Sequence, residues 1–501
     1  MRAESDPADD VVLSTGRRVW TVGVMCTAVG LVIAMVTIVN AALPALAADT
    51  GASQAEQTWI VDVYTLMLAA LVLPAGALGD RHGRRGVLVA GLLVFAAGCA
   101  APVFLDTSTW IIAARAVTGL GAAMIMPATL SIITASFPPE RRGRAIGTWA
   151  AVAGVGGLGG LVLAGVLLQH FAWHSVFLGP AVLSVVLVAA SLTVPTSRDR
   201  RPHAFDVAGA VLSALAIGAV VFGILRVADL GWGNATVLGS IAGGLVLGAL
   251  FVGYELRRES PLLDVRLFGN AAFAAGSVSV TVQFTAAFGM FYALAQYLQL
   301  VQGYSALKSG LALWPVAVTL FPLSLASAPL VRRFGLRAVT CTGLAVVVVG
   351  MVLIGQLDAG SGYAALAIAV CVLGGGIGVT APAATSAILD NVSPSQYGVA
   401  SAVNDATREV GAALGIALVG SVLSAGYTDS VRSATAALAP PAREAAEGSL
   451  AGALAAAVGP GGAELAASAR AAFAHGMGIS MLALAAVVVA GIVAAAVLVR
   501  R

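Results

Sequence analysis

The sequence predicts an all-α integral membrane protein with fourteen spanning helices, arranged as two six-helix bundles and one inserted pair. Of its 501 residues, 59% are hydrophobic and 10% are charged, whereas a soluble domain carries roughly 25% charged residues. Hydrophobic runs of about 20 residues, the length that a helix needs to cross a bilayer, recur along the chain. The positions of the arginines and an internal repeat then indicate the number of spans and their division into halves.

The hydrophobic runs define the predicted spans in order. They fall at 19–43, 58–79, 86–105, 108–135, 144–168, 174–194, 205–226, 234–254, 271–301, 308–330, 338–357, 361–388, 399–425 and 474–499. Cytoplasmic loops carry an excess of Lys and Arg. If the N-terminus is cytoplasmic, most basic residues outside the spans fall in inner segments, and the outer segments hold only Arg226, Lys308, Arg432, Arg443 and Arg470. We therefore expect fourteen spans with both termini cytoplasmic.

An internal repeat relates spans four and five to spans twelve and thirteen. Residues 121–160 align with residues 376–415 at a constant offset of 255. The identical pairs include Gly121 and Gly376, Pro127 and Pro382, Ser131 and Ser386, Pro139 and Pro394, Gly143 and Gly398, Gly156 and Gly411, and Gly160 and Gly415. Two equivalent six-span halves leave spans seven and eight as an insertion. Parallel halves of this kind are the plan of a transporter that rocks around a midplane site.

The repeat and the spans predict the following division of the chain. Residues 1–18 form a cytoplasmic N-terminal tail, and residues 19–195 form the N-terminal six-helix bundle. Residues 196–260 contain a cytoplasmic linker and the inserted spans seven and eight. Residues 261–501 form the C-terminal bundle, with an extracellular loop at 427–473 that we expect to contain one or two short amphipathic helices.

The turn after span two contains a motif rich in glycine and charged residues, GALGDRHGRR, at residues 76–85. A small residue at Gly76 permits close packing of helices, and Asp80 can engage the neighbouring half. The spacing Gly-Asp-Arg-x-Gly-Arg is specific, although basic residues alone would also serve as an anchor in the cytoplasmic interface. The residues singled out in this motif are Gly76, Asp80, Arg81, Gly83, Arg84 and Arg85, and the family resemblance described below implies a gating role for them.

Span four carries an arginine in the middle of the hydrophobic segment IIAARAVTGLGAAMIMP, residues 111–127. A guanidinium there costs about 2.5–3.5 kcal/mol or more and does not lose its proton in practice. Arg115 must therefore have a partner or a water-filled cavity. It is either a fixed cation that couples the protonation of a nearby carboxylate to the conformation of the protein, or one member of a static ion pair near the outer interface.

Two further motifs lie on span five, AVAGVGGLGGLVLAGVLL (151–168), and on span one, LVIAMVTIVNAALP (31–44). With the two motifs above, they resemble the major facilitator superfamily, specifically its fourteen-span drug:proton antiporters, over essentially the whole chain. The resemblance implies that residues 76–85 act as a conformational latch and that span five is the exporter motif. The usual proline of that motif is missing, and Met35 stands where the family commonly has an acid, so a preference for divalent cationic drugs is not expected.

With Asp206 assigned to the cytoplasmic linker, three acids are expected inside the membrane, where a charge is costly and proton binding is correspondingly favoured. Asp62 matches the family pattern WxVDxY on span two and is either a proton or cation site or a solvated carboxylate at the outer edge. Asp405 and Glu409 share one face of span thirteen at i,i+4 spacing, with Arg408 beside them. Either Arg408 neutralises one of the two acids, or the acids form a protonation switch. Two acids against one arginine leave one carboxylate spare, which favours the switch.

We also expect an adaptable drug pocket with aromatic and polar walls. Span nine carries a stripe of aromatic and polar side chains that fits such a pocket, and a packing or lipid-facing surface is an equally good interpretation of this stripe. The pocket residues predicted are Trp59, Asn40, Phe288, Tyr292, Gln296, Trp314 and Asn404.

These observations predict a proton-coupled multidrug exporter that moves lipophilic cationic or neutral amphiphilic compounds outward by alternating access. Each proton entering down a 100 mV potential supplies about 2.3 kcal/mol. A dedicated exporter of one antibiotic or metabolite, a proton-coupled uptake carrier and a lipid-handling or sensory protein remain alternatives. The sequence contains no Walker loop, catalytic triad or metal cluster, so we expect no enzyme activity, no cofactor, no metal and no nucleic-acid partner. We expect a monomer in the bacterial cytoplasmic (inner) membrane.

Overall fold

The computed structural model describes residues 14–105, 107–195, 205–436, 438–458 and 461–498. The N-terminal half contains α1 (Thr15–Thr50), α2 (Gln54–His82), α3 (Arg84–Ala100), α4 (Ser108–Ser136), α5 (Pro139–His170) and α6 (Ser175–Ser191). The inserted pair contains α7 (Val207–Leu225), α8 (Val227–Leu230) and α9 (Ala235–Glu255). The C-terminal half contains α10 (Ala271–Gln296), α11 (Ala306–Ala312), α12 (Pro315–Phe334), α13 (Leu336–Gly355), α14 (Tyr363–Leu389), α15 (Tyr397–Thr435), α16 (Pro440–Gly448), α17 (Leu450–Ala456) and α18 (Gly462–Leu498).

The protein is a multi-pass membrane protein, because thirteen helical segments of the described chain are long and apolar enough to cross a bilayer. The predicted sixth span corresponds to α6, an apolar helix of 17 residues, which extends about 26 Å at 1.5 Å per residue. This length lies at the lower limit for a spanning helix, so the exact number of fourteen spans stays a prediction. The start of the predicted tail and part of the predicted linker, residues 1–13 and 196–204, lie outside the described residues.

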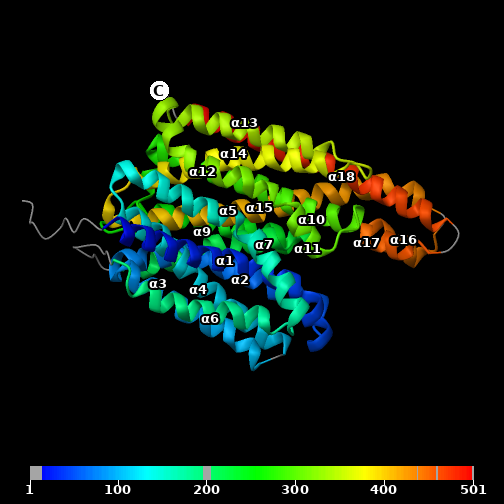
Figure 1. The fold of residues 1–501 in the computed structure, drawn as a ribbon, viewed down its shortest axis with the longest axis horizontal. Coiled ribbons are helices and arrows are strands. Elements are labelled where there is room, and N and C mark those ends of the chain that lie inside the picture. The colour runs from blue at the N-terminus through cyan, green and yellow to red at the C-terminus, as the bar shows by residue number, and fades with distance from the viewer. Residues whose placement is uncertain (1–13, 106, 196–204, 437, 459–460, 499–501) are drawn as a thin grey trace, which may run out of the picture.

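The helices depart from a simple pattern in two of the predicted segments. In the predicted tenth span, 308–330, α11 ends at Ala312 and α12 begins at Pro315, because proline cannot donate to the preceding turn and its ring clashes there; the two helices together form one candidate span. Within the predicted outer loop, 427–473, α15 continues to Thr435 and α18 begins at Gly462. Alanine, which is abundant in this segment, has the highest helix propensity. The two short helices expected in the loop are α16 and α17, and they project beyond most spans at one end of the molecule (Figure 1).

The two halves meet in two related helix crossings near the helix ends that carry most arginines, which we call the arginine-rich end. At the first crossing, α2 lies so close to α15 that a Cβ added at Gly76 would be 2.5 Å from the Gly398 carbonyl oxygen. At the second, a Cβ added at Gly143 of α5 would be 2.6 Å from the Cβ of Ala328 on α12. Gly143 and Gly398 are partners in the internal repeat. The crossings are therefore pseudo-symmetric, and both depend on residues with little or no side chain.

The inserted pair packs against both halves. A Cβ added at Gly218 of α7 would be 3.3 Å from Ala70 of α2. Further along, Ile224 and Val227 share one apolar cluster with Ala413 and Ala417 of α15. The α7–α8 segment therefore lies beside α2 and α15 together, and this position brings it close to the acidic residue predicted at the outer end of α2.

The close approach of α2 and α15 predicts that Gly76→Ala destabilises the protein and lowers transport. The added methyl group would meet both the Gly398 carbonyl and Ala402, and overpacking of this kind costs roughly 1–3 kcal/mol. Gly86→Ala on α3 is the matched control, because a Cβ there meets nothing within 4 Å. Thermal unfolding of the purified variants measures the effect. Equal melting temperatures for the two variants would contradict the packing described.

Candidate functional site

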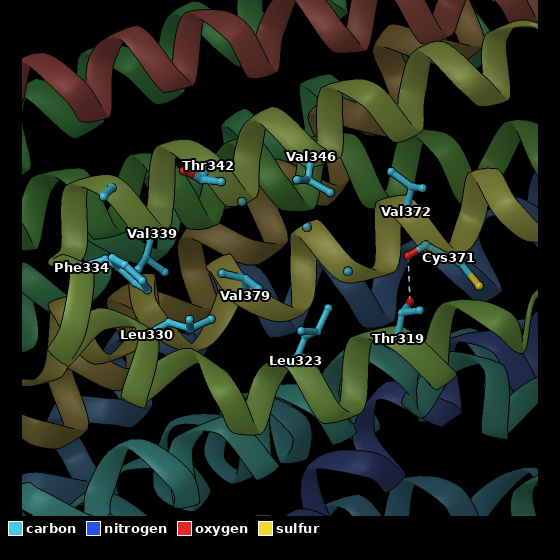
Figure 2. Close-up of a pocket in the computed structure, with 14 residues that line it drawn as sticks. Thr319, Leu323, Leu330, Phe334, Val339, Thr342, Val346, Cys371, Val372 and Val379 are labelled. Atoms are coloured by element: carbon cyan, nitrogen blue, oxygen red, sulfur yellow. Dashed lines mark hydrogen bonds between the residues drawn. The ribbon is translucent and has the colours of Figure 1, made fainter.

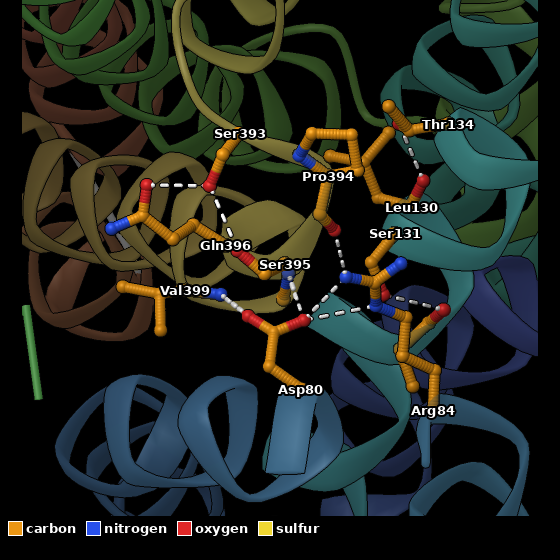
Figure 3. A network of polar contacts seen from close by, with 12 residues as sticks. Asp80, Arg84, Leu130, Ser131, Thr134, Ser393, Pro394, Ser395, Gln396 and Val399 are labelled. Atoms are coloured by element: carbon orange, nitrogen blue, oxygen red, sulfur yellow. Dashed lines mark hydrogen bonds and ion pairs between the residues drawn. The ribbon is translucent and has the colours of Figure 1, made fainter. Parts of the chain in front are cut away.

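A carboxylate from one half caps a helix of the other half at the arginine-rich end. Asp80, near the C-terminus of α2, accepts hydrogen bonds from the backbone N–H groups of Gly398 at 2.8 Å and Val399 at 2.9 Å (Figure 3). These groups belong to the first turn of α15, whose N-cap residue Gln396 makes no side-chain capping bond. The first N–H groups of a helix have no intrahelical partner and carry partial positive charge. The Asp80 carboxylate thus takes the part of the missing capping side chain of α15, supplied across the interface between the halves.

Arg84 holds this carboxylate in place and adds its own contact to the C-terminal half. Its Nε and one terminal nitrogen donate to Asp80 Oδ1 at 2.9 and 2.6 Å, and the same terminal nitrogen donates to the Pro394 carbonyl at 2.6 Å. The turn that allows this geometry passes through Gly83, whose φ of 102° is strained for a residue with a side chain. We call Asp80, Arg84, Pro394, Gly398 and Val399 the α2–α15 contact.

Arg142 and Arg332 add further contacts between the halves at this end. Arg142 of α5 pairs with Asp390 at 3.1 Å and lies over the ring of Tyr397, 5.2 Å from its centroid. Arg332 of α12 donates to the Glu140 carbonyl at 3.3 Å. The repeat offset of 255 relates Arg142 to Tyr397, so these two repeat positions touch each other across the interface.

The structure separates the predicted gating residues into two groups. Gly76, Asp80, Gly83 and Arg84 form or support the α2–α15 contact. Arg85 instead donates to carbonyl groups after α6 within the N-terminal half, at 3.1 Å for Val194. Arg81 lines a pocket of about 390 Å³ together with Asp80, Asp206 and Asp264. Arg85 therefore anchors its own half and does not bridge the two.

A buried ionisable cluster lies further along α15. Asp405 is fully buried and lies 3.6 Å from Arg408, while its Oδ1 accepts from the Asn404 amide at 3.2 Å. Asn404 accepts in turn from Thr385 of α14 at 2.9 Å. Asp405 and Arg408 thus form the internally neutralised pair that the sequence left open. Glu409 makes no ion pair with any described residue and is half-buried, so it is the spare carboxylate.

Aromatic rings from both halves enclose Arg408. Its guanidinium lies 4.5 Å from the ring centroid of Phe284 on α10 and 5.1 Å from that of Trp149 on α5. Phe288 stacks on Phe284 with the centroids 5.9 Å apart. The Trp149 indole N–H donates to Thr129 at 3.0 Å, which fixes its orientation. The cluster therefore lies at the interface of the halves, between cation-binding aromatic faces.

Arg115 forms no ion pair with a carboxylate of the described chain, so the static pair considered from the sequence is not present. Its Nε donates to the Ile60 carbonyl at 2.8 Å, and its guanidinium lies 4.2 Å from the ring centroid of Tyr64. Both terminal nitrogens are buried without a hydrogen-bond partner among the described residues. The Tyr64 hydroxyl donates to the Val32 carbonyl at 2.8 Å. The described contacts of Arg115 thus lie within the N-terminal half.

Asp62 is an ion-paired residue and not a freely solvated carboxylate. Its Oδ2 lies 3.4 Å from a terminal nitrogen of Arg226, at the end of α7, and its side chain is 15% exposed. Arg226 also lies over the ring of Trp59, 4.4 Å from the centroid. The predicted outer acid therefore has a partner on the inserted pair, which the sequence indicated only as one of five basic residues on the outer side.

The predicted pocket residues do not form one group. Asn404 lies in the ionisable cluster, Phe288 lies beside it, and Trp59 lies with Asp62. Three others are exposed at the molecular surface or on an open face: Asn40, Tyr292 with 37% and Trp314 with 41% of the residue exposed. Gln296 is half-buried, and its amide donates to the Tyr292 carbonyl at 3.5 Å.

Sequence reasoning missed Trp149, Thr385 and Arg226 as site residues. The repeat contained a signal for Trp149, because the offset of 255 relates it to Asn404. The same offset relates Asp405, Arg408 and Glu409 to small residues in the N-terminal half, so the charged cluster belongs to one half only. No sequence pattern indicated that Arg226 would reach Asp62.

A separate apolar groove of about 680 Å³ runs between α12, α13 and α14 in the C-terminal half (Figure 2). Its walls are mainly valine and leucine side chains and small residues, and Thr319 donates to the Cys371 carbonyl at 2.8 Å across it. Its lining contains no Asp, Glu, Arg or His. This groove is therefore distinct from the ionisable cluster.

The fold and the contacts between its halves define a membrane transporter of two related bundles. A sequence profile of the Major Facilitator Superfamily matches residues 25–416, and the chain belongs to this superfamily. Two solved structures share the fold at 16% identity: the human organic anion transporter MFSD10 (TM-score 0.62, covering 95% of this chain and 100% of that one) and a bacterial homologue of the human lysosomal transporter Spinster (TM-score 0.60, covering 96% and 98%).

Similar sequences are drug efflux, export or resistance proteins by name. The chain is 36% identical to the multidrug efflux pump LfrA of Mycolicibacterium smegmatis, over 91% of this chain and 92% of that protein. It is 35% identical to the methyl viologen resistance protein SmvA of Salmonella typhimurium, over 79% and 80%. It is 30% identical to the tetracenomycin C resistance and export protein of Streptomyces glaucescens, over 78% and 73%. The resemblance to drug exporters drawn from the motifs is thereby confirmed.

The capping role of Asp80 predicts that Asp80→Asn loosens the arginine-rich end. The amide keeps one acceptor but loses the charge that interacts with Arg84 and with the helix N-terminus, and loss of an N-cap costs about 0.5–2 kcal/mol. Spin labels at the exposed positions Glu140 and Ser393 would report a larger population of long distances between the halves. Asp429→Asn, which changes a carboxylate that is 77% exposed, should leave the distances unchanged. A wild-type distribution for Asp80→Asn would contradict the capping role.

Proposed function

We propose that this chain exports lipophilic cationic or neutral amphiphilic compounds in exchange for protons. The exporter family is the established part, and the proton coupling and the substrate class are the proposal. The observation that supports it most strongly is the position of the cluster at Asp405, Arg408 and Glu409. It lies buried at the interface of the halves, on the helix whose N-terminus is held by Asp80.

The proposed coupling uses the excess of carboxylates over arginines in this cluster. Asp405 has Arg408 as its partner, whereas Glu409 has no ion pair among the described residues and is half-buried. A carboxylate between two moving bodies is stable as a charge only where water or a cation reaches it. Proton binding at Glu409 therefore favours the state in which the halves enclose it, and proton release favours the state that opens it to water or to a cationic substrate.

The substrate class follows from the walls of the cluster. Phe284, Phe288 and Trp149 offer aromatic faces, which attract a cation or stack on a flat amphiphile. A carboxylate beside such rings favours a monovalent lipophilic cation, while the rings alone accept neutral compounds. The names of LfrA and SmvA support organic cations in general and not the monovalent class in particular, because they describe multidrug efflux and resistance to methyl viologen, an organic dication.

The proposed orientation puts the arginine-rich end in the cytoplasm of a bacterium, with the chain in the inner membrane. The basic residues at the starts of α3 and α5 and at the end of α12 are consistent with this orientation, because inner loops carry an excess of Lys and Arg. A cysteine at position 140 should then react with an impermeant thiol reagent only in inverted vesicles.

The proposed exchange is tested by collapse of a pH gradient in inverted vesicles. A panel of lipophilic cations and neutral amphiphiles is added to vesicles with and without the protein. At least one compound should dissipate the gradient only when the protein is present. If no compound does so, the proposed exchange of drug for protons is wrong.

Glu409→Gln should abolish the drug-dependent proton flux while the protein remains folded, because the amide is uncharged and cannot exchange a proton. The expected loss is at least tenfold, with size-exclusion behaviour and melting temperature close to those of the wild type. Glu464→Gln on α18 makes the same chemical change at an exposed position and should transport normally. Wild-type flux in the Glu409 variant would assign that residue a structural role.

A further inference from the structure

Arg226 occupies a small site formed by two aromatic rings and two carboxylates at the outer end of α2 and α7. Its guanidinium lies 4.4 Å from the ring centroid of Trp59 and 5.8 Å from that of Phe222. One terminal nitrogen lies 3.4 Å from Asp62, and the other donates to Asp229 at 2.9 Å. The Arg226 and Asp62 side chains are only 13% and 15% exposed, whereas that of Asp229 is 45% exposed, so the contact between Arg226 and Asp62 is largely removed from solvent and Asp229 is open to it.

The groups around Arg226 have the chemistry of a binding site for organic cations. Trp59 and Phe222 are stacked at 28° with their centroids 6.1 Å apart, and Trp is the aromatic side chain with the strongest attraction for a cation. Asp62 supplies a negative charge at one edge of the rings. A lipophilic cation in this site would make the contacts with the aromatic rings and with Asp62 that Arg226 now makes.

We propose that Arg226 is a tethered internal cation that competes with a cationic substrate for the site formed by Trp59, Phe222 and Asp62. A monovalent lipophilic cation enters this site by displacing the guanidinium, which stays paired with Asp229. A neutral amphiphile does not compete with Arg226. The inference rests on the proposed export of lipophilic compounds and identifies a residue that sets the preference between cationic and neutral ones.

The segment that carries Arg226 contacts both halves, so displacement of the Arg226 side chain by a substrate would affect both. Arg226 stands at the junction of α7 and α8. The segment that follows packs against α15, through Val227 in the cluster with Ala413 and Ala417. Trp232 then donates its indole N–H to Ser421 of α15 at 2.8 Å. The inserted pair thus joins Asp62 of the N-terminal half to α15 of the C-terminal half, and Arg226 is its polar contact with α2.

The test measures the binding of tetraphenylphosphonium to the purified full-length protein. Arg226→Gln and Arg226→Met both remove the charge, and Met retains the length and the apolar contact with Trp59. Either variant should bind tetraphenylphosphonium about tenfold more tightly than the wild type, because the internal competitor is gone while Asp62 and Trp59 remain. Binding of a neutral amphiphile, N-phenyl-1-naphthylamine, should change less than twofold.

Three further variants make the result specific. Arg432→Gln removes an arginine from another i,i+3 pair with an aspartate, at a position that is 66% exposed, and should leave the affinity for tetraphenylphosphonium unchanged. Arg226→Lys keeps the charge and should stay within about twofold of the wild type. Adding Trp59→Leu to Arg226→Gln should cancel the gain, because the aromatic face is then missing.

Unchanged or weaker binding of tetraphenylphosphonium by both neutral variants would overturn the inference. If the wild type still dissipates a pH gradient on addition of that cation, the proposed function stands without the role of Arg226. If neither the wild type nor any variant binds or moves any compound of the panel, the proposed function fails and the inference fails with it.

Discussion

The structure depends on one hydrogen-bonded contact between the halves, in which Asp80 of α2 caps the N-terminus of α15. A helix that lacks its own capping side chain obtains one from the other bundle. The contact joins the two halves at the arginine-rich end, and its partners are a single carboxylate and the backbone N–H groups of one helical turn. Gly76 and Gly398 make it possible by letting the two backbones approach.

The helix that Asp80 caps also carries the ionisable cluster. Asp405 lies seven residues and Glu409 eleven residues after Gly398, or about 10 and 17 Å along α15 at 1.5 Å per residue. A rigid helix therefore connects the contact at its end with the charges at its middle. Tilting of α15 must break the cap at one end and change the surroundings of Glu409 further along. The inserted pair touches the same helix beyond the cluster, through Trp232 and Ser421.

The sequence predicted those features of the fold and site that leave a recognisable pattern along the chain. Hydrophobic runs and the repeat gave the helical bundles, and the acids within spans gave Asp62, Asp405 and Glu409. Contacts between distant segments left no such signal: the capping of α15 by Asp80, the pairing of Asp62 with Arg226, and the position of Arg115 beside Tyr64 all join residues more than 40 positions apart. Aromatic residues were the least predictable, because Trp314 and Trp149 look alike in the sequence and only the packing of α5 against the C-terminal half distinguishes them.

The most direct measurement of the connection through α15 is the distance between spin labels at positions 140 and 393 as the pH is changed. We predict that lowering the pH changes the proportions of short and long distances between the two labels in the wild type. In Glu409→Gln these proportions should be the same at every pH. An equally large pH-dependent shift in the Glu409 variant would show that this carboxylate does not control the closure at Asp80.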